Sequence, residues 1–191
     1  HLEVVDFFSN RDSASASNVH RIPAVLIGPD GRDNVRYFGL PSGFEFALLL
    51  DTIVAASDRR SARQLETRRQ LKALQEDVHI QVFVTPSCQY CPAIGRLAHL
   101  MALESPRVSA DVVEVQEFPH LARLYQVRGV PLTVIDDKVA FAGAVTERDF
   151  MLVPLLDLAP TPDDPRDHTN LRQAHRRLRY RCILGRWSDE R

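Results

Sequence analysis

The stretch that decides the fold reads Val78-His79-Ile80-Gln81-Val82-Phe83-Val84-Thr85-Pro86-Ser87-Cys88-Gln89-Tyr90-Cys91. Its first eight residues predict a strand, and Pro92–Glu104 beyond it has the apolar spacing of a helix. Two cysteines with two residues between them, at a strand-to-helix turn, are placed for thiol–disulfide exchange. A helix N-terminus favours the thiolate of the first cysteine, and the second sulfur is close enough to resolve a mixed disulfide.

The bulk composition is that of an ordinary soluble protein with one large or two small domains. Of 191 residues, 45% are apolar and 26% are charged, and the net charge of −1 gives no general attraction to nucleic acid or membranes. No apolar run is long enough to span a bilayer, and no signal peptide is apparent. The chain begins at His1 rather than Met, which leaves open both a longer parent protein and the loss of a signal peptide. Three cysteines are too few for a disulfide-stapled secreted scaffold, so we expect a cytoplasmic protein.

A metal site is the main alternative for the cysteine pair. Zinc needs about four ligands, and the other candidate ligands are scattered along the chain: His79, His99, His120 and Cys182. We therefore favour a redox dithiol and expect neither a bound metal nor a cofactor. The chain has no GxGxxG fingerprint for a dinucleotide. A metal or iron–sulfur site shared between two chains through Cys88 stays open.

The second half of the chain predicts the element order β-α-β-α-β-β-α, which favours a small mixed sheet with helices on both faces. After the first strand and the helix described above, the expected elements are a strand at 108–115, a short helix at 118–125, a hairpin of 132–135 with 140–141, and a closing helix at 146–156.

The first half predicts fewer elements. We expect strands at 2–8, 23–27 and 35–38, a loop or poor helix at 10–18, and a helix at 43–56. A charged helix to about Gln75, which begins with a capping box at Ser61, then connects the two halves.

The two halves also repeat each other. His20-Arg21-Ile22-Pro23-Ala24-Val25-Leu26-Ile27 parallels Val127-Arg128-Gly129-Val130-Pro131-Leu132-Thr133-Val134-Ile135, and each proline precedes a hairpin, a glycine and a helix. Phe46 and Phe150 each lie seven residues past that glycine. The repeat predicts two units of one α/β fold in tandem. We expect a partial unit at 1–57, a connecting helix at 58–76, a complete unit at 77–157 and a basic tail at 158–191.

These motifs resemble a known superfamily. Thr85–Pro92 followed by Val127–Pro131 resembles the active half of the glutaredoxin/thioredoxin fold. With Gly39–Phe46 closing the first unit, residues 2–157 resemble the two-unit glutaredoxin-like protein disulfide oxidoreductases. They are also similar to the N-terminal thioredoxin-like module of flavin-dependent peroxiredoxin reductases. The resemblance implies tandem thioredoxin-like folds, the second complete and the first partial.

The resemblance also implies a role for each site residue. Cys88 would be the attacking thiol and Cys91 the buried resolving thiol. Pro131 would be a cis-proline that faces the dithiol and exposes the backbone of Val130 as a docking edge for a substrate peptide. Tyr90 would be an exposed residue at the rim that contacts the substrate; the alternative is a simple surface aromatic.

The chain departs from the family pattern at three places. Val82 stands where thioredoxins carry a buried acid, so the proton acceptor for Cys91 has to be water or another group. Ala142-Gly143-Ala144 replaces the paired glycine of glutathione-binding relatives. The first unit has no cysteine and lacks the first strand and helix of the fold, so we expect it to be non-catalytic and to offer surface for a partner or a dimer.

The tail after Pro160 is rich in arginine between residues 172 and 186. It predicts a solvated or partly helical appendage, with electrostatic contact to an acidic partner or nucleic acid as the alternative. Cys182 lies beside Arg181, which could activate it, but an isolated thiol in a tail is more often incidental.

The predicted function is that of an enzyme, a protein disulfide oxidoreductase that acts on protein disulfides through Cys88 and Cys91. A separate flavoprotein disulfide reductase would supply its electrons. A homodimer stays open, and neither membrane nor nucleic acid is an expected partner. The alternatives are an electron relay to a peroxiredoxin and a non-catalytic binding or assembly protein.

Overall fold

The computed structural model describes residues 2–28, 31–57, 65–150 and 180–182. The helices are α1 (Arg11–Ala16), α2 (Glu45–Ser57), α3 (Leu65–Ala73), α4 (Cys91–Glu104), α5 (Pro119–Leu124) and α6 (Glu147–Phe150). The strands are β1 (Ala24–Leu26), β2 (Val35–Phe38), β3 (Val78–Val84), β4 (Val108–Glu114), β5 (Leu132–Ile135), β6 (Val139–Ala142) and β7 (Tyr180–Cys182).

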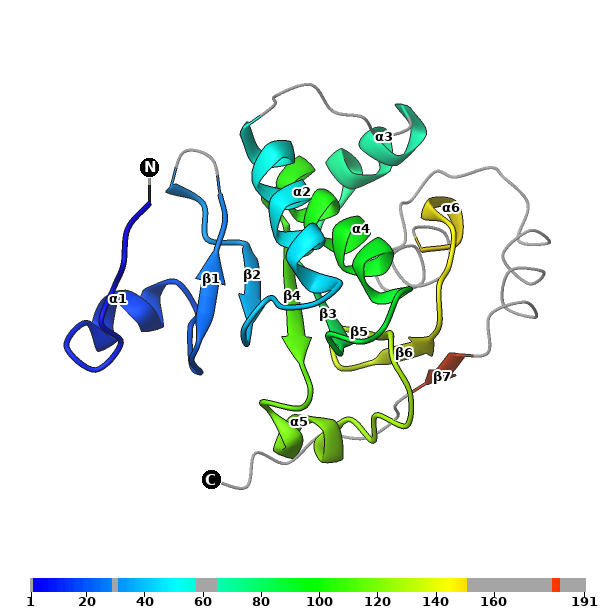
Figure 1. The fold of residues 1–191 in the computed structure, drawn as a ribbon. Helices are drawn as coiled ribbons and strands as arrows, with labels where there is room; N and C mark the ends of the chain where they lie inside the picture. Colours follow the sequence, from blue (N-terminus) through cyan, green and yellow to red (C-terminus); the bar gives the residue numbers. More distant parts are fainter. Residues whose placement is uncertain (1, 29–30, 58–64, 151–179, 183–191) are drawn as a thin grey trace.

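All of these strands form one mixed sheet in the order β1-β2-β4-β3-β5-β6-β7. β4 pairs in parallel with both β2 and β3, whereas the other neighbours are antiparallel. The β2–β4 pairing joins the first half of the chain to the second, so both halves share a single sheet (Figure 1).

The helices cover the two faces of this sheet and enclose two clusters of buried side chains. One cluster joins α2, α4 and α6 to the sheet through residues such as Leu48, Ile94 and Phe150. The other lies on the opposite face and includes Leu121 of α5. The fold is therefore an α/β thioredoxin-like arrangement, with a mixed sheet between two helical layers.

A buried ion network fixes the register of the three central strands. The carboxylate of Asp111 on β4 accepts a hydrogen bond from Arg36 Nε on β2 at 2.6 Å and pairs with His79 Nε2 on β3 at 2.8 Å. Burial alone would raise the pKa of Asp111, but His79 and Arg36 outweigh it and lower that pKa. A register slip would leave these charges buried and unpaired, which is strongly destabilising.

The structure confirms the strands predicted near 24–26, 35–38, 78–84, 108–114 and 132–135, and the cysteine helix at 91–104. The prediction of a strand at 2–8 is wrong, because these residues have no strand neighbour among those described and remain irregular. The tail, predicted to be an appendage, contributes the strand β7, which pairs with β6.

Three other predicted features lie outside the described residues: Ser61, the closing helix beyond residue 150 and the rest of the tail. In the described part of the chain, no helix combines the length and apolarity needed to cross a membrane.

Candidate active site

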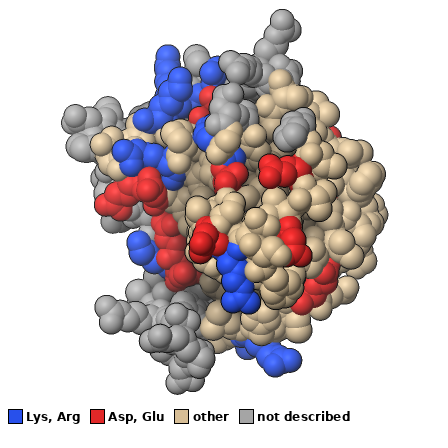
Figure 2. Space-filling view, turned by 90° about the vertical axis from the view of Figure 1, so that its left-hand side faces the viewer, with Lys and Arg blue, Asp and Glu red and all other residues tan. Residues whose placement is uncertain are grey.

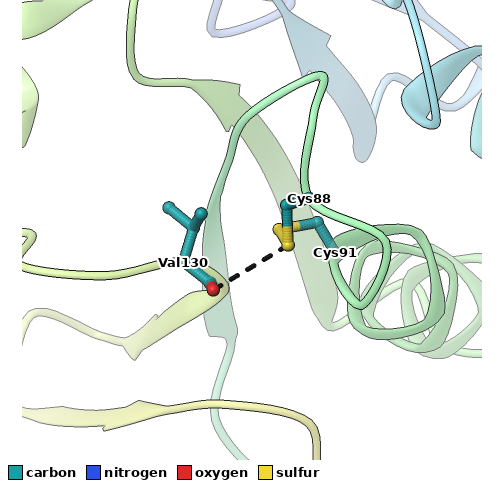
Figure 3. Close-up of a disulfide and its surroundings, with 3 residues drawn as sticks. All are labelled: Cys88, Cys91 and Val130. Carbon is teal, nitrogen blue, oxygen red and sulfur yellow. Dashed lines mark hydrogen bonds between the residues drawn. A yellow bond between two sulfur atoms is a disulfide. The ribbon is translucent and has the colours of Figure 1, made fainter.

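Cys88 and Cys91 form a disulfide at the start of α4 (Figure 3). Their Cα atoms are 5.5 Å apart. The turn after β3 carries Cys88, which is partly exposed, while Cys91 is the first residue of the helix and is fully buried. One sulfur is thus accessible to a partner and the other is shielded behind it.

The loop before β5 faces this disulfide. The carbonyl oxygen of Val130 lies 3.8 Å from Cys88 Sγ (Figure 3), and the Val130–Pro131 peptide bond is cis. In the disulfide Cys88 has no proton to donate, so this approach is a contact between the sulfur and the carbonyl. Because β5 pairs with β3, the sheet itself holds the two loops side by side.

Tyr90 lies between the two cysteines and is 60% exposed. It precedes α4 without a side-chain hydrogen bond to the helix. The structure therefore brings Cys88, Cys91, Val130 and Pro131 together and leaves Tyr90 on the surface beside them; its role in substrate contact remains a prediction.

A buried acid from the first half of the chain lies beside the start of α4. The helices α2 and α4 run parallel, as three contacts show: Phe44 N–H donates to the Pro86 carbonyl at 3.0 Å, Asp51 pairs with Arg96 at 3.3 Å, and Thr52 Oγ1 lies 3.0 Å from His99 Nδ1. Glu45 is the first residue of α2 and Cys91 the first residue of α4, so the parallel packing puts both at the same end of the helix pair.

The environment of Glu45 is unusual for a carboxyl group. Its side chain is fully buried, and neither oxygen has a hydrogen-bond partner among the described residues. Burial, together with the charge of Glu114, raises the pKa of Glu45 to about 8. A carboxyl group with such a pKa can exchange a proton with a thiol near neutral pH.

Sequence reasoning identified the lack of an acid at Val82 but missed Glu45. Val82 is fully buried and belongs to the same cluster as Cys91. A signal was present in the sequence, because Glu45 is a lone acid between Phe44 and Phe46 at the start of an apolar helix. Its burial near the start of α4 depends on the packing of α2 on α4, which no local pattern predicts.

Within the described ranges, no group of three or more His, Cys, Asp or Glu side chains could hold a metal ion.

The comparisons with known proteins agree with this geometry. Residues 78–155 match the family model described as a thioredoxin domain. The chain contains a thioredoxin-like domain. A protein disulfide oxidoreductase from Aeropyrum pernix is 35% identical, with a TM-score of 0.71, over 76% of this chain and 63% of that one. The N-terminal domain of an alkylhydroperoxide reductase from Enterococcus faecalis shares the fold, with a TM-score of 0.70 and 21% identity over 75% of this chain and 70% of that one.

The curated relatives of this thioredoxin-like chain are much longer. An alkyl hydroperoxide reductase from Staphylococcus aureus is 25% identical over 150 residues, which are 78% of this chain and 29% of the relative. A protein named NADH dehydrogenase from Ferdinandcohnia aciditolerans is 22% identical over 75% of this chain and 28% of its own length. The chain therefore spans less than a third of each.

Proposed function

We propose that this protein is a thiol–disulfide oxidoreductase that exchanges disulfides with protein substrates through Cys88 and Cys91. The observation that carries the proposal is the approach of the Val130 carbonyl, next to cis-Pro131, to within 3.8 Å of Cys88 Sγ. A backbone edge at this position would let an extended substrate segment pair beside the accessible sulfur. The relative from Aeropyrum pernix, named a protein disulfide oxidoreductase, supports the same chemistry.

The reaction starts from the dithiol form. The Cys88 thiolate attacks one sulfur of the substrate disulfide, so the Cys88–substrate bond forms and the first substrate thiolate leaves. Cys91 then loses its proton and attacks Cys88, which releases the second substrate thiolate. The protein loses two electrons as its disulfide forms, and the substrate gains them.

Glu45 is suited to accept the proton of Cys91 in the second step. It begins α2 at the end of the helix pair where Cys91 begins α4, and its buried carboxyl group has a pKa of about 8. A general base works best when its pKa lies near the working pH, and a pKa of about 8 meets this condition near neutral pH. Glu45 would thus serve in place of the acid that Val82 does not supply.

The experiment that tests the proposal is reduction of insulin disulfides by the dithiol form. Cys88→Ser should reduce the rate to background, and Cys91→Ser should accumulate a mixed disulfide through Cys88, detectable by mass. Cys88→Ser with unchanged activity, or no mixed disulfide with Cys91→Ser, would contradict the mechanism.

A second candidate is an electron relay to a peroxiredoxin, fed by a flavoprotein reductase. The likeness to relatives named alkyl hydroperoxide reductase favours it. Reduction of a peroxiredoxin at least a hundredfold faster than insulin would support the relay, whereas equal rates would support a general oxidoreductase.

A further inference from the structure

Two acidic residues, Glu45 and Glu114, are buried in this protein without a cation beside them in the described ion pairs. Figure 2 shows one face of the molecule, on which Asp and Glu side chains are solvent-exposed, as charged residues usually are. Glu45 and Glu114 are instead 0% and 2% exposed, and Tyr37 is 1% exposed. Asp111 is buried as well, but it is paired with Arg36. The buried groups near Glu45 therefore decide when its carboxyl group can ionise.

Tyr37 and Glu114 lie on the same face of the sheet. β2 and β4 pair in parallel, with Tyr37 opposite Val112. Because side chains alternate between the two faces of a strand, Glu114 shares the face of Val112 and Tyr37. Tyr37 and Val112 belong to the buried cluster that α2 and α4 cover (Figure 1). A Cβ on Gly39, two residues past Tyr37, would lie 2.7 Å from Cβ of Glu114, which shows how closely the ends of these strands approach.

Glu45 begins α2 at the same edge of the sheet. β2, β4 and β3 are parallel, so their carboxyl ends lie together, and Tyr37 and Glu114 are at or next to the last residue of their strands. Phe44, directly before Glu45, donates its N–H to the Pro86 carbonyl just past β3 at 3.0 Å. This bond holds the start of α2 at the carboxyl ends of the three strands.

The charges of these groups act on one another, as expected for one cluster. Burial, together with the charge of Glu114, raises the pKa of Glu45 to about 8. Burial also raises the pKa of Tyr37, and the charge of Glu45 adds more to this rise than those of Glu114 and Glu117. The Tyr37 hydroxyl therefore keeps its proton at neutral pH and can act as a hydrogen-bond donor.

The hydrogen bonds of the cluster leave one pair of side chains unsatisfied. The carboxylate of Glu114 accepts the N–H of Gln116 at 3.0 Å and that of Glu117 at 2.8 Å. Neither oxygen of Glu45 has a partner among the described residues, and nor does the hydroxyl of Tyr37. Buried polar atoms without a partner are costly. Because a carboxylate only accepts hydrogen bonds, Tyr37 is the member of the cluster that can donate one to ionised Glu45.

We propose that Tyr37 is a positioning residue for the resolving step: its hydroxyl donates a hydrogen bond to the Glu45 carboxylate and so sets the pH at which Glu45 accepts the proton of Cys91. This inference rests on the proposed function, in which Glu45 receives that proton. The S–H bond of Cys91 breaks as an O–H bond forms on Glu45, and Tyr37 keeps its own proton throughout. The hydroxyl stabilises the carboxylate against burial and against the charge of Glu114.

The test is a pH titration of the oxidised protein, followed by the infrared band of the protonated carboxyl group. Glu45→Gln lacks this group and identifies the band. Tyr37→Phe removes the donor and should raise the pKa of Glu45 by about one to two units. Tyr125→Phe is the matched control, because Tyr125 is a buried tyrosine on the opposite face of the sheet, with its hydroxyl bonded to Asp137. It should leave the pKa of Glu45 unchanged.

A single turnover of the dithiol form gives the second measurement. Tyr37→Phe should slow the resolving step at pH 7 about tenfold and move its pH profile upward by as much as the pKa of Glu45, while the attack by Cys88 is retained. A merely structural role would lower the rate at every pH and leave the profile in place. Circular dichroism and the thermal midpoint check that each variant is folded.

An equal or lower pKa of Glu45 in Tyr37→Phe would overturn the proposal. A raised pKa with an unmoved pH profile would overturn it too, since Cys91 would then give its proton to another group. If Tyr37→Phe does not fold, replacement of Tyr37 by 3-fluorotyrosine decides: its more acidic hydroxyl should lower the pKa of Glu45, and an unchanged pKa would contradict the hydrogen bond. The infrared titration needs no turnover, so a failure of insulin reduction would contradict the proposed function alone.

Discussion

The hydroxyl of Thr52 on α2 lies 3.0 Å from Nδ1 of His99 on α4, inside the contact between the two helices. His99 Nε2 approaches the backbone carbonyl of Arg36 on β2 at 3.2 Å. Nε2–H donates to that carbonyl, and burial favours the neutral ring by lowering the pKa of His99 to about 4. This pair helps to hold α2 and α4 in parallel, which puts Glu45 and Cys91 at the same end of the helix pair.

His99 should make the protein sensitive to acid. Burial lowers the pKa of His99 to about 4 in the folded protein, whereas the unfolded chain takes up that proton near pH 6.5. Between these values the unfolded state binds more protons, so stability falls as the pH falls, by about 3 kcal/mol in total. Urea unfolding of the oxidised protein from pH 7 to pH 4 measures this slope, and His99→Gln should flatten it. An unchanged slope in the variant would show that other groups cause the acid sensitivity.

Glu45 should have the opposite effect on stability. The unfolded chain releases this proton near pH 4.5 and the folded protein near pH 8. Between these values the folded state binds more protons, so stability falls as the pH rises, with a loss of about 3 kcal/mol by pH 7. Glu45→Gln should be more stable than the parent at pH 8 and about equal to it at pH 5, measured by urea unfolding. A difference that does not depend on pH would contradict the raised pKa.

Glu45→Gln should also slow the release of substrate. If Glu45 accepts the proton of Cys91, its loss should slow the resolving step at pH 7 about a hundredfold, while the attack by Cys88 is retained. Rapid quenching of a single turnover separates the two steps. Asp51→Asn, at an exposed position of the same helix, is the matched control. Equal resolving rates in Glu45→Gln and the parent would assign the proton to water.

The glycines that end the two matching hairpins should respond differently to substitution. Gly39 and Gly143 have φ values of 109° and 91°, so alanine is strained at both, by about 1–2 kcal/mol. A Cβ at Gly39 would lie 2.7 Å from Cβ of Glu114, whereas a Cβ at Gly143 would have no neighbour within 4 Å among the described residues. Gly39→Ala should therefore be less stable than Gly143→Ala by at least about 1 kcal/mol in urea unfolding. Equal losses of stability in the two variants would mean that backbone strain, and not the contact with Glu114, causes both losses.

Most of the fold around the cysteines could be predicted from local patterns. Local patterns predict three parts of the fold that the structure confirms: the strand at 78–84, the helix after Cys91 and the hairpin at 132–142. The repeat around Pro23 and Pro131 was visible in the sequence, and both peptide bonds before these prolines are cis. The strand predicted at 2–8 failed, because an apolar run forms a strand only where a neighbour pairs with its backbone, and no described strand pairs with these residues.

The sequence by itself determined a cysteine pair suited to disulfide exchange, since the spacing of Cys88 and Cys91 and the strand and helix that flank them are local properties of the chain. Only the tertiary structure decided what surrounds that pair. The Val130 carbonyl reaches Cys88 because β5 pairs with β3, and Glu45 lies at the same end of the helix pair as Cys91 because α2 packs in parallel on α4. The pKa of Glu45 follows from that burial, which is a property of the packed fold and not of the residue.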